Sequence, residues 1–485
     1  MPLTTRHARE MAIVFVAQAG SAFAALDAVK LLTALLLPAE YGYTAIVTSY
    51  VVAIVTVLAA PGIGAGQMMF HEAVQQGRTR RLLGTLFVTT AVTALVPVVL
   101  LTATRHIESL DRARSLGGLI ACGLLYLAAE VLKGPAVAIT GAARWRGLYA
   151  TLLMGDGWGK LLLIAAAAGW LSLSAKTVLI AYAINSALIG AAGWLAIFRF
   201  APHDAERRFF SKDIARATVR HGWYFAGIGA AGWLINLSDR VLLSTMVPAY
   251  DVGIYVAGYQ AAAILPVGLS ALITGFMSPI LLQKHASDPP QAAHFLGRVA
   301  VFTLWLLLPA TVVAMTHRDL LLRILTSGRY AAAAPVVLWV APALAFLAIN
   351  NAVTIAFWMT KRINQYFFIA VTAGVLNVIA NLILVPRYGF IAAAVSTFCT
   401  YALQMLGSIF IGRRYVRWRP AFGEVTAVLA GAAALIGTLL AFAGRLPWVA
   451  MAVALAAYAV ASLGVFLLLD EQGRHALARF REEYR

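Results

Sequence analysis

The sequence predicts an all-α polytopic membrane protein with about 14 transmembrane helices. Of its 485 residues, 61% are hydrophobic and only 12% are charged, a composition far from that of soluble globular proteins. The apolar residues form long stretches of about 20 residues, the length with which a helix crosses a hydrocarbon core. A transmembrane β-barrel would instead show alternating segments of about ten residues. The chain is therefore expected to lie in a membrane over nearly its whole length.

The apolar stretches follow one another in chain order, separated by short polar linkers. The first begins after Arg6 and Arg9, is long enough to span a membrane and runs on into a second span, so we interpret it as a retained helix. A break at Pro61-Gly62 makes the second stretch less regular. The predicted spans are 11–36, 44–69, 82–104, 116–140, 148–170, 177–198, 221–246, 252–282, 297–315, 332–358, 364–385, 389–411, 422–443 and 447–469.

The basic residues indicate how these spans are oriented. The chain has 38 Lys and Arg and a net charge of +18. Placing the N-terminus inside the cell puts most of them in cytoplasmic loops, which favours two cytoplasmic termini. The predicted outer loops 105–114 and 318–329 also carry arginines, and we interpret both as solvated loops. Because the basic residues lie in short loops without an aromatic platform, nucleic-acid binding is not expected.

Motifs for catalysis lack the context that their chemistry requires. The glycine-rich segment 227–232 lies inside an apolar span with no preceding strand, which favours close helix packing. Gly159-Lys160 is followed by Leu161, where a phosphate loop needs Ser or Thr. His71-Glu72 lacks the second histidine of a zinc-protease helix. The longest polar segment, about 199–220, is too short for a catalytic domain. The sequence therefore predicts no enzyme activity, no metal site and no cofactor.

Charged residues inside the spans are the candidates for function. A charge at bilayer depth costs at least about 2.5–3.5 kcal/mol on insertion scales, so such residues normally face a cavity or a partner. Each basic residue in a span has an acidic residue nearby, and three of the pairs share one helical face because their members are three or four residues apart. The pairs are Asp27 with Lys30, Glu130 with Lys133, Asp156 with Lys160, and Asp239 beside Arg240.

Two of these pairs are predicted to meet. The fourth and fifth spans form an antiparallel hairpin around residues 144–145, and residues equally far from the turn lie at equal depth. Lys133 is then level with Asp156, and Glu130 is level with Lys160. Two interpretations stay open for these four residues: a buried clamp that fixes the helix register, or a cavity lining that exchanges partners during transport.

The other two pairs are candidates for substrate binding. They lie at similar depth in the first and seventh spans. Asp239 and Arg240 are adjacent, so their side chains point about 100° apart on a helix. A lumen-facing arginine offers a planar, bidentate donor suited to phosphate. Arg240 therefore contacts either an anionic substrate group or a structural partner, and the same alternatives hold for Lys30.

A weak internal repeat suggests the domain organisation. Residues 38–45 resemble residues 248–257 when two inserted residues are allowed. Six spans separate the copies, so both have the same orientation, and a substrate site is expected between two parallel halves. The predicted parts are an N-lobe with a connector at 1–220, a C-lobe at 221–420, two extra helices at 421–469 and a cytoplasmic tail at 470–485.

Three motifs together resemble the polysaccharide-exporter (Wzx-type) flippases of the multidrug/oligosaccharidyl-lipid/polysaccharide (MOP) superfamily. The first is the Pro-Ala-Glu-Tyr-Gly turn at 38–42, and the second joins Ser-Asp-Arg at 238–240 to Val-Gly-Ile-Tyr at 252–255. The third is Leu-Val-Pro-Arg-Tyr-Gly-Phe-Ile-Ala-Ala-Ala at 384–394. The similarity covers about the first twelve spans.

The resemblance implies a V-shaped pair of six-helix lobes around a cationic cavity. It implies movement of an undecaprenyl-diphosphate-linked oligosaccharide across the bacterial inner membrane by alternating access, for surface polysaccharide biosynthesis. Arg240 and Lys30 would contact diphosphate or acidic sugars. Asp27 or Asp239 would carry a coupling proton, although the coupling ion, proton or sodium, stays open. The implied partners are membrane lipids, a polymerase and a chain-length regulator. The resemblance also implies that the protein is a monomer.

Three alternatives remain. A cation-coupled multidrug exporter would share the superfamily architecture but should place more acids than bases in its cavity. A lipid II flippase would also carry a diphosphate lipid. A polysaccharide polymerase or membrane glycosyltransferase is disfavoured, because the sequence shows no large outer loop and no acidic catalytic cluster.

Overall fold

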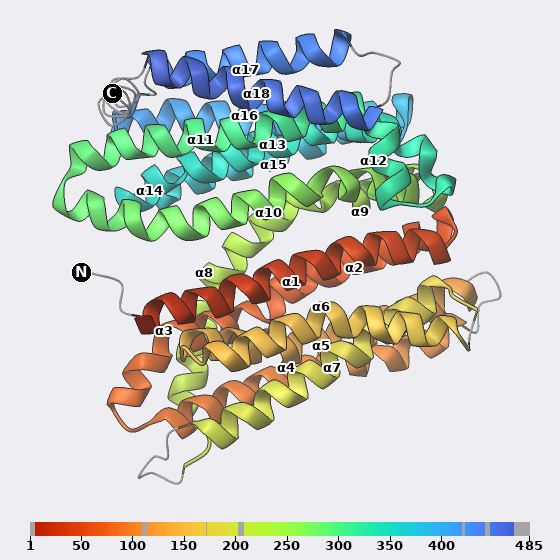
Figure 1. The fold of residues 1–485 in the computed structure, drawn as a ribbon. Coiled ribbons are helices and arrows are strands. Elements are labelled where there is room, and N and C mark those ends of the chain that lie inside the picture. The colour runs from red at the N-terminus through yellow and green to blue at the C-terminus, as the bar shows by residue number, and fades with distance from the viewer. Residues whose placement is uncertain are drawn as a thin grey trace. The chain divides into compact units, whose positions relative to one another are not determined.

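The computed structural model describes residues 5–108, 114–170, 172–201, 208–419, 422–441 and 447–469. In these ranges almost every residue is helical and no strand occurs, which confirms the all-α fold class (Figure 1). Twelve helices of the described ranges are long and apolar enough to cross a membrane. The α8–α9 pair and α18, whose described apolar stretch is the shorter Met451–Val465, account for the rest of the fourteen predicted spans. The predicted tail, 470–485, lies outside the described residues.

The helices follow the predicted spans, with ends that differ by up to nine residues. The first nine are α1 (Thr5–Leu35), α2 (Pro38–Leu58), α3 (Ala60–Gln75), α4 (Thr79–Glu108), α5 (Arg114–Ala142), α6 (Arg146–Ala168), α7 (Ala175–Phe200), α8 (Lys212–Asn236) and α9 (Ser238–Met246). The others are α10 (Ala249–Ser287), α11 (Pro289–Thr316), α12 (Arg318–Leu325), the 3₁₀ helix η1 (Gly328–Ala333), α13 (Ala334–Val353), α14 (Ile355–Met359), α15 (Ile363–Tyr388), α16 (Phe390–Tyr415), α17 (Phe422–Ala441) and α18 (Pro447–Leu469).

Three predicted spans are broken into two helices each. The second breaks at Ala59, just before Pro61, whose ring fits the first turn of α3. The seventh breaks at Leu237, where the backbone has φ −136° and ψ −9°. The tenth breaks at Thr354.

The predicted outer loop at 318–329 is helical, and its solvation stays a prediction. The segment forms α12 and part of η1. Apolar residues at 320–322 and 324–325 share the α12 turns with Asp319 and Arg323, both of which are exposed, while Leu322 is buried. This spacing gives one apolar and one charged face, which stabilises a short helix packed against its neighbours. Much of the other predicted outer loop, 105–114, lies outside the described residues.

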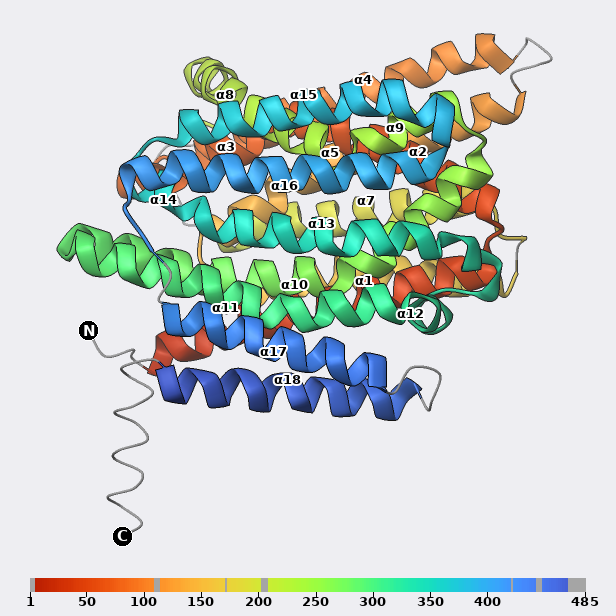
Figure 2. The same ribbon diagram turned by 90° about the horizontal axis from the view of Figure 1, so that it is seen from above.

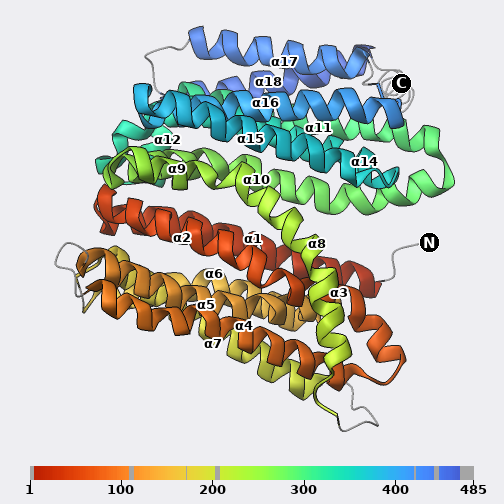
Figure 3. The same ribbon diagram turned by 180° about the vertical axis from the view of Figure 1, so that it is seen from behind.

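The chain packs as two compact units, residues 1–256 and 257–485. The predicted lobes at 1–220 and 221–420 stay a prediction. In the first unit, α5 packs against α4 and α7, α1 lies along α6, and α8 crosses α3 and α2 (Figures 1 and 3). Glycines allow α1 and α6 to approach closely, since a Cβ at Gly20 would contact Met154 and one at Gly157 would contact Ala24.

Within the first unit, the beginnings of the two repeat segments touch each other. A Cβ added at Gly42 would lie 1.9 Å from the carbonyl oxygen of Ala249, and one added at Gly253 would lie 1.9 Å from the carbonyl oxygen of Pro38. Gly42 therefore lies against Ala249 and Gly253, and Gly253 lies against Pro38. In each segment the glycine comes four residues after the start of its helix, α2 or α10.

In the second unit, α13 and α15 pack against α16, and the α17–α18 hairpin lies along α11 (Figure 2). The hairpin is attached by polar contacts as well as apolar packing. Arg298 Nε of α11 lies 2.5 Å from Glu424 Oε1 of α17. Trp305 Nε1 donates to Ser462 Oγ at 3.0 Å, and the Tyr458 hydroxyl donates to the Trp305 carbonyl at 2.7 Å. The two predicted extra helices are thus firmly docked on α11.

Candidate functional site

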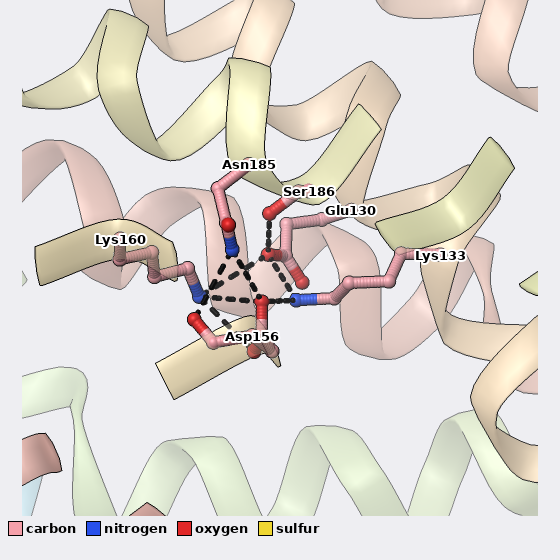
Figure 4. A network of polar contacts seen from close by, with 6 residues as sticks. All are labelled: Glu130, Lys133, Asp156, Lys160, Asn185 and Ser186. Carbon is pink, nitrogen blue, oxygen red and sulfur yellow. Dashed lines mark hydrogen bonds and ion pairs between the residues drawn. The ribbon is translucent and has the colours of Figure 1, made fainter. Parts of the chain in front are cut away.

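The clearest candidate site is a cluster of four charges in the first unit (Figure 4). Helices α5 and α6 form the predicted hairpin, whose turn holds Arg144 at φ +57°. Lys133 Nζ lies 2.6 Å from Glu130 Oε1 and 2.9 Å from Asp156 Oδ1. Lys160 Nζ lies 3.2 Å from Asp156 and 3.8 Å from Glu130. All four predicted pairings, two across the hairpin and two within its helices, are therefore present, while their part in transport stays a prediction.

Helix α7 adds two buried polar residues that the sequence interpretation missed. Asn185 Nδ2 donates to the Asp156 carbonyl at 3.1 Å and to its Oδ1 at 3.2 Å, and Ser186 Oγ donates to Glu130 Oε1 at 2.6 Å (Figure 4). A Cβ at Gly159 would lie 2.1 Å from Asn185 Oδ1, so this glycine makes room for the contact. The signal in the sequence was an Asn-Ser pair in an apolar span, where polar groups need partners.

Two tyrosines border Lys160. Its ammonium lies 5.5 Å from the ring centroid of Tyr182 and 6.0 Å from that of Tyr126. The two rings are 5.6 Å apart. These distances allow cation–π attraction, which strengthens when water is excluded. The two lysines therefore have different surroundings: Lys133 is held between carboxylates, whereas Lys160 is shared between carboxylates and aromatic rings.

Asp239 and Arg240 lie in the first turn of α9, directly after the break between α8 and α9. Both are buried, with 5% and 7% of their surface exposed. Asp239 Oδ1 accepts from the Arg240 backbone N–H at 2.8 Å, and its Oδ2 accepts from the hydroxyl of Tyr255. Because both side chains point into packed surroundings, the break in the helix positions a buried cation and a buried anion side by side.

Asp27 and Lys30 are exposed on α1. The packing of α1 on α6 determines the depth of these two residues. The two helices run in the same direction, as shown by the contact of Gly20 with Met154 and, further along both helices, of Ala24 with Gly157. One turn further along both helices, Asp27 reaches the level of Lys160. The four candidate pairs thus all belong to the first unit, and the binding roles predicted for them stay predictions.

A second polar cluster, also missed from the sequence, is buried in the second unit. Asn377 Nδ2 donates to Ser396 Oγ and Thr400 Oγ1, each at 3.3 Å, and Asn381 Nδ2 donates to Asn377 Oδ1 at 2.9 Å. These bonds join α15 to α16 with neutral groups, the usual polar contact between membrane helices. Among the described residues, no three His, Cys, Asp or Glu side chains are grouped so that they could hold a metal ion.

Comparisons with known proteins agree with this architecture. The family model described as polysaccharide biosynthesis protein matches residues 159–285. The lipid II flippase MurJ, in an inward closed conformation, is similar with a TM-score of 0.72 at 13% identity, covering 98% of this chain and 99% of MurJ. An inward-facing multidrug resistance MATE transporter has a TM-score of 0.63 at 11% identity, covering 83% and 94%. The MATE transporter VcmN of Vibrio cholerae has a TM-score of 0.55 at 16% identity, covering 85% and 98%. No curated protein matches the chain.

The chain shares its fold with MurJ and with the MATE structure, which is named as a member of the MOP superfamily, and twelve of its described helices are long and apolar enough to cross a membrane. The polysaccharide biosynthesis model matches part of the sequence, and the fold of MurJ covers nearly the whole length of the chain. The resemblance predicted from the motifs is therefore confirmed. The matched segment contains Lys160, Asp239 and Arg240.

Proposed function

We propose that the protein moves an undecaprenyl-diphosphate-linked oligosaccharide from the inner to the outer leaflet of the bacterial inner membrane, for surface polysaccharide biosynthesis. The observation that carries the proposal is the polysaccharide biosynthesis match over 159–285, in a chain with a flippase fold. That segment holds three of the intramembrane charges, Lys160, Asp239 and Arg240. Both termini are cytoplasmic on this proposal, and the partners are membrane lipids, a polymerase and a chain-length regulator.

The chemistry of the substrate supports this choice. A diphosphate does not cross hydrocarbon unaided, because leaving water costs an isolated charge far more than the substrate can recover from apolar contacts. Buried Arg240 and exposed Lys30 would replace that water by charge-assisted hydrogen bonds. Asp27 or Asp239 would carry the coupling proton, and sodium is the alternative coupling ion.

Deletion of the gene in its native host tests the proposal. Surface polymer should disappear, and intact lipid-linked repeat units should accumulate in the inner membrane. Restoring the gene with Arg240→Ala should leave most of the accumulation in place, whereas Arg146→Ala, which lies at the start of α6, should restore export. Unchanged polymer after deletion would refute the proposed function.

A lipid II flippase is the second candidate, because MurJ is similar over 98% of this chain. Depletion would then stop growth rather than only remove surface polymer. The similarity to MATE transporters supports a multidrug exporter as a third candidate. In that case deletion would leave the polymer intact and raise drug sensitivity.

A further inference from the structure

The two lysines of the charge cluster are held unequally. Lys133 makes ion pairs of 2.6 and 2.9 Å with two different carboxylates, and its side chain is 10% exposed. Lys160 makes longer ion pairs of 3.2 and 3.8 Å with the same carboxylates, and its side chain is 21% exposed. Ion pairs weaken as their length and exposure increase. Lys160 is therefore the cation that leaves the cluster at lower cost.

The charges that Lys160 would leave behind remain bonded. Lys133 bridges Glu130 and Asp156, and these carboxylates also accept hydrogen bonds from Ser186 and Asn185. Withdrawal of Lys133 would instead remove the shortest ion pair of each carboxylate. The cluster is thus built so that one ammonium holds it together while the other can change its partner.

The groups around Lys160 are suited to bind an anionic group that has lost its water of hydration. The rings of Tyr126 and Tyr182 border the ammonium, and a phenolic hydroxyl can donate a hydrogen bond to a phosphate oxygen. Lys160 of α6 therefore lies beside one phenol from α5 and one from α7.

We propose that Lys160, between Tyr126 and Tyr182, is a phosphate-binding residue that exchanges Asp156 for the phosphate of the lipid-linked substrate. This inference rests on the proposed function, because it takes the diphosphate of that substrate as the ligand. The exchange keeps Lys160 paired in both states. Lys133 keeps both carboxylates paired throughout.

Binding of undecaprenyl diphosphate to the purified full-length protein tests the inference, with the dissociation constant measured from ligand-dependent thermal stabilisation. Lys160→Gln should weaken binding about tenfold or more, since it removes a charge-assisted hydrogen bond. Lys160→Arg should bind within about threefold of wild type. Asp156→Asn should tighten binding, because Lys160 loses the carboxylate that competes with phosphate. Lys212→Gln is the matched control: Lys212 is exposed at the start of α8 and should have no effect.

The double variant Lys160→Gln with Asp156→Asn guards against a folding defect. It leaves Glu130 and Lys133 as a neutral pair at 2.6 Å, so the protein should fold and still bind weakly. Wild-type affinity in Lys160→Gln and in the double variant, or no binding by wild type, would overturn the inference. Phosphatidylglycerol and inorganic pyrophosphate are the comparison ligands. Equal Lys160-dependent binding of phosphatidylglycerol would assign the site to phospholipid headgroups and overturn the assignment to substrate.

The two proposals fail in different experiments. The proposed function fails when gene deletion does not cause lipid-linked repeat units to accumulate. The phosphate site fails when deletion does cause accumulation but Lys160→Gln binds undecaprenyl diphosphate as wild type does.

Discussion

Reversing the charge of Lys133 should destabilise the first unit more than any other single change in the charge cluster. Lys133→Asp removes ion pairs of 2.6 and 2.9 Å and leaves Lys160 alone with three carboxylates. The Lys133 side chain is only 10% exposed, so solvent screens these interactions little. Breaking a buried ion pair costs about 3–5 kcal/mol. At about 2 °C per kcal/mol for a unit of this size, the melting temperature should fall by about 6–10 °C.

The double swap Lys133→Asp with Asp156→Lys should recover about half of this loss. Opposite charges then meet again across the hairpin, at positions 133 and 156 and at Glu130 and Lys160. The swap does not restore the pairs within each helix, because like charges would then lie three residues apart on α5 and four apart on α6. Recovery is therefore expected to be partial.

Thermal unfolding of purified protein in detergent, together with the amount of folded protein recovered from membranes, measures both effects. Lys212→Asp is the control, because Lys212 is exposed at the start of α8. The reasoning is refuted by equal damage from the single and double variants, or by a single variant that melts within about 2 °C of the control.

Three further predictions use the same thermal assay. Gly42→Ala should cost about 1–3 kcal/mol, because its Cβ would lie 1.9 Å from a backbone oxygen, whereas Gly437→Ala meets nothing within 4 Å and should cost nothing. Glu424→Gln should cost about 1–3 kcal/mol by weakening a charge-assisted hydrogen bond, and adding Arg298→Met should recover part of it; no recovery would contradict a direct pairing. Tyr255→Phe should cost about 1.5–3 kcal/mol, since the buried Asp239 loses a donor, and a cost near zero would show that this bond adds nothing.

The helices and the main charge cluster were predictable because both depend on local spacing. Apolar length determines where a membrane-crossing segment lies, and the described helices cover the predicted spans with ends that differ by up to nine residues. The pairing of Lys133 with Asp156 follows from their equal distance from the turn at 144–145, which the antiparallel hairpin converts into equal depth. A hairpin leaves little freedom in register when its connection is short.

The missed residues depend on contacts between helices that are far apart in sequence. Asn185 and Ser186 join the cluster from α7, and nothing in their own span specifies which helix they face. The same holds for Arg298 and Glu424, which are 126 positions apart. The aromatic setting of Lys160 was missed for the same reason, since Tyr182 comes from a third helix.

The docked hairpin α17–α18 has a consequence for related chains of different length. Arg298 lies on α11 and meets its carboxylate partner on α17, so a chain without the hairpin would keep an arginine at this depth without Glu424. The arginine would then lose its charge-assisted hydrogen bond to this carboxylate. Relatives that end after the twelfth span should therefore carry an uncharged residue in place of Arg298, and a smaller or apolar residue in place of Trp305, whose indole N–H donates to Ser462. Loss of the last two helices should thus change the residues at these two positions of the ninth span.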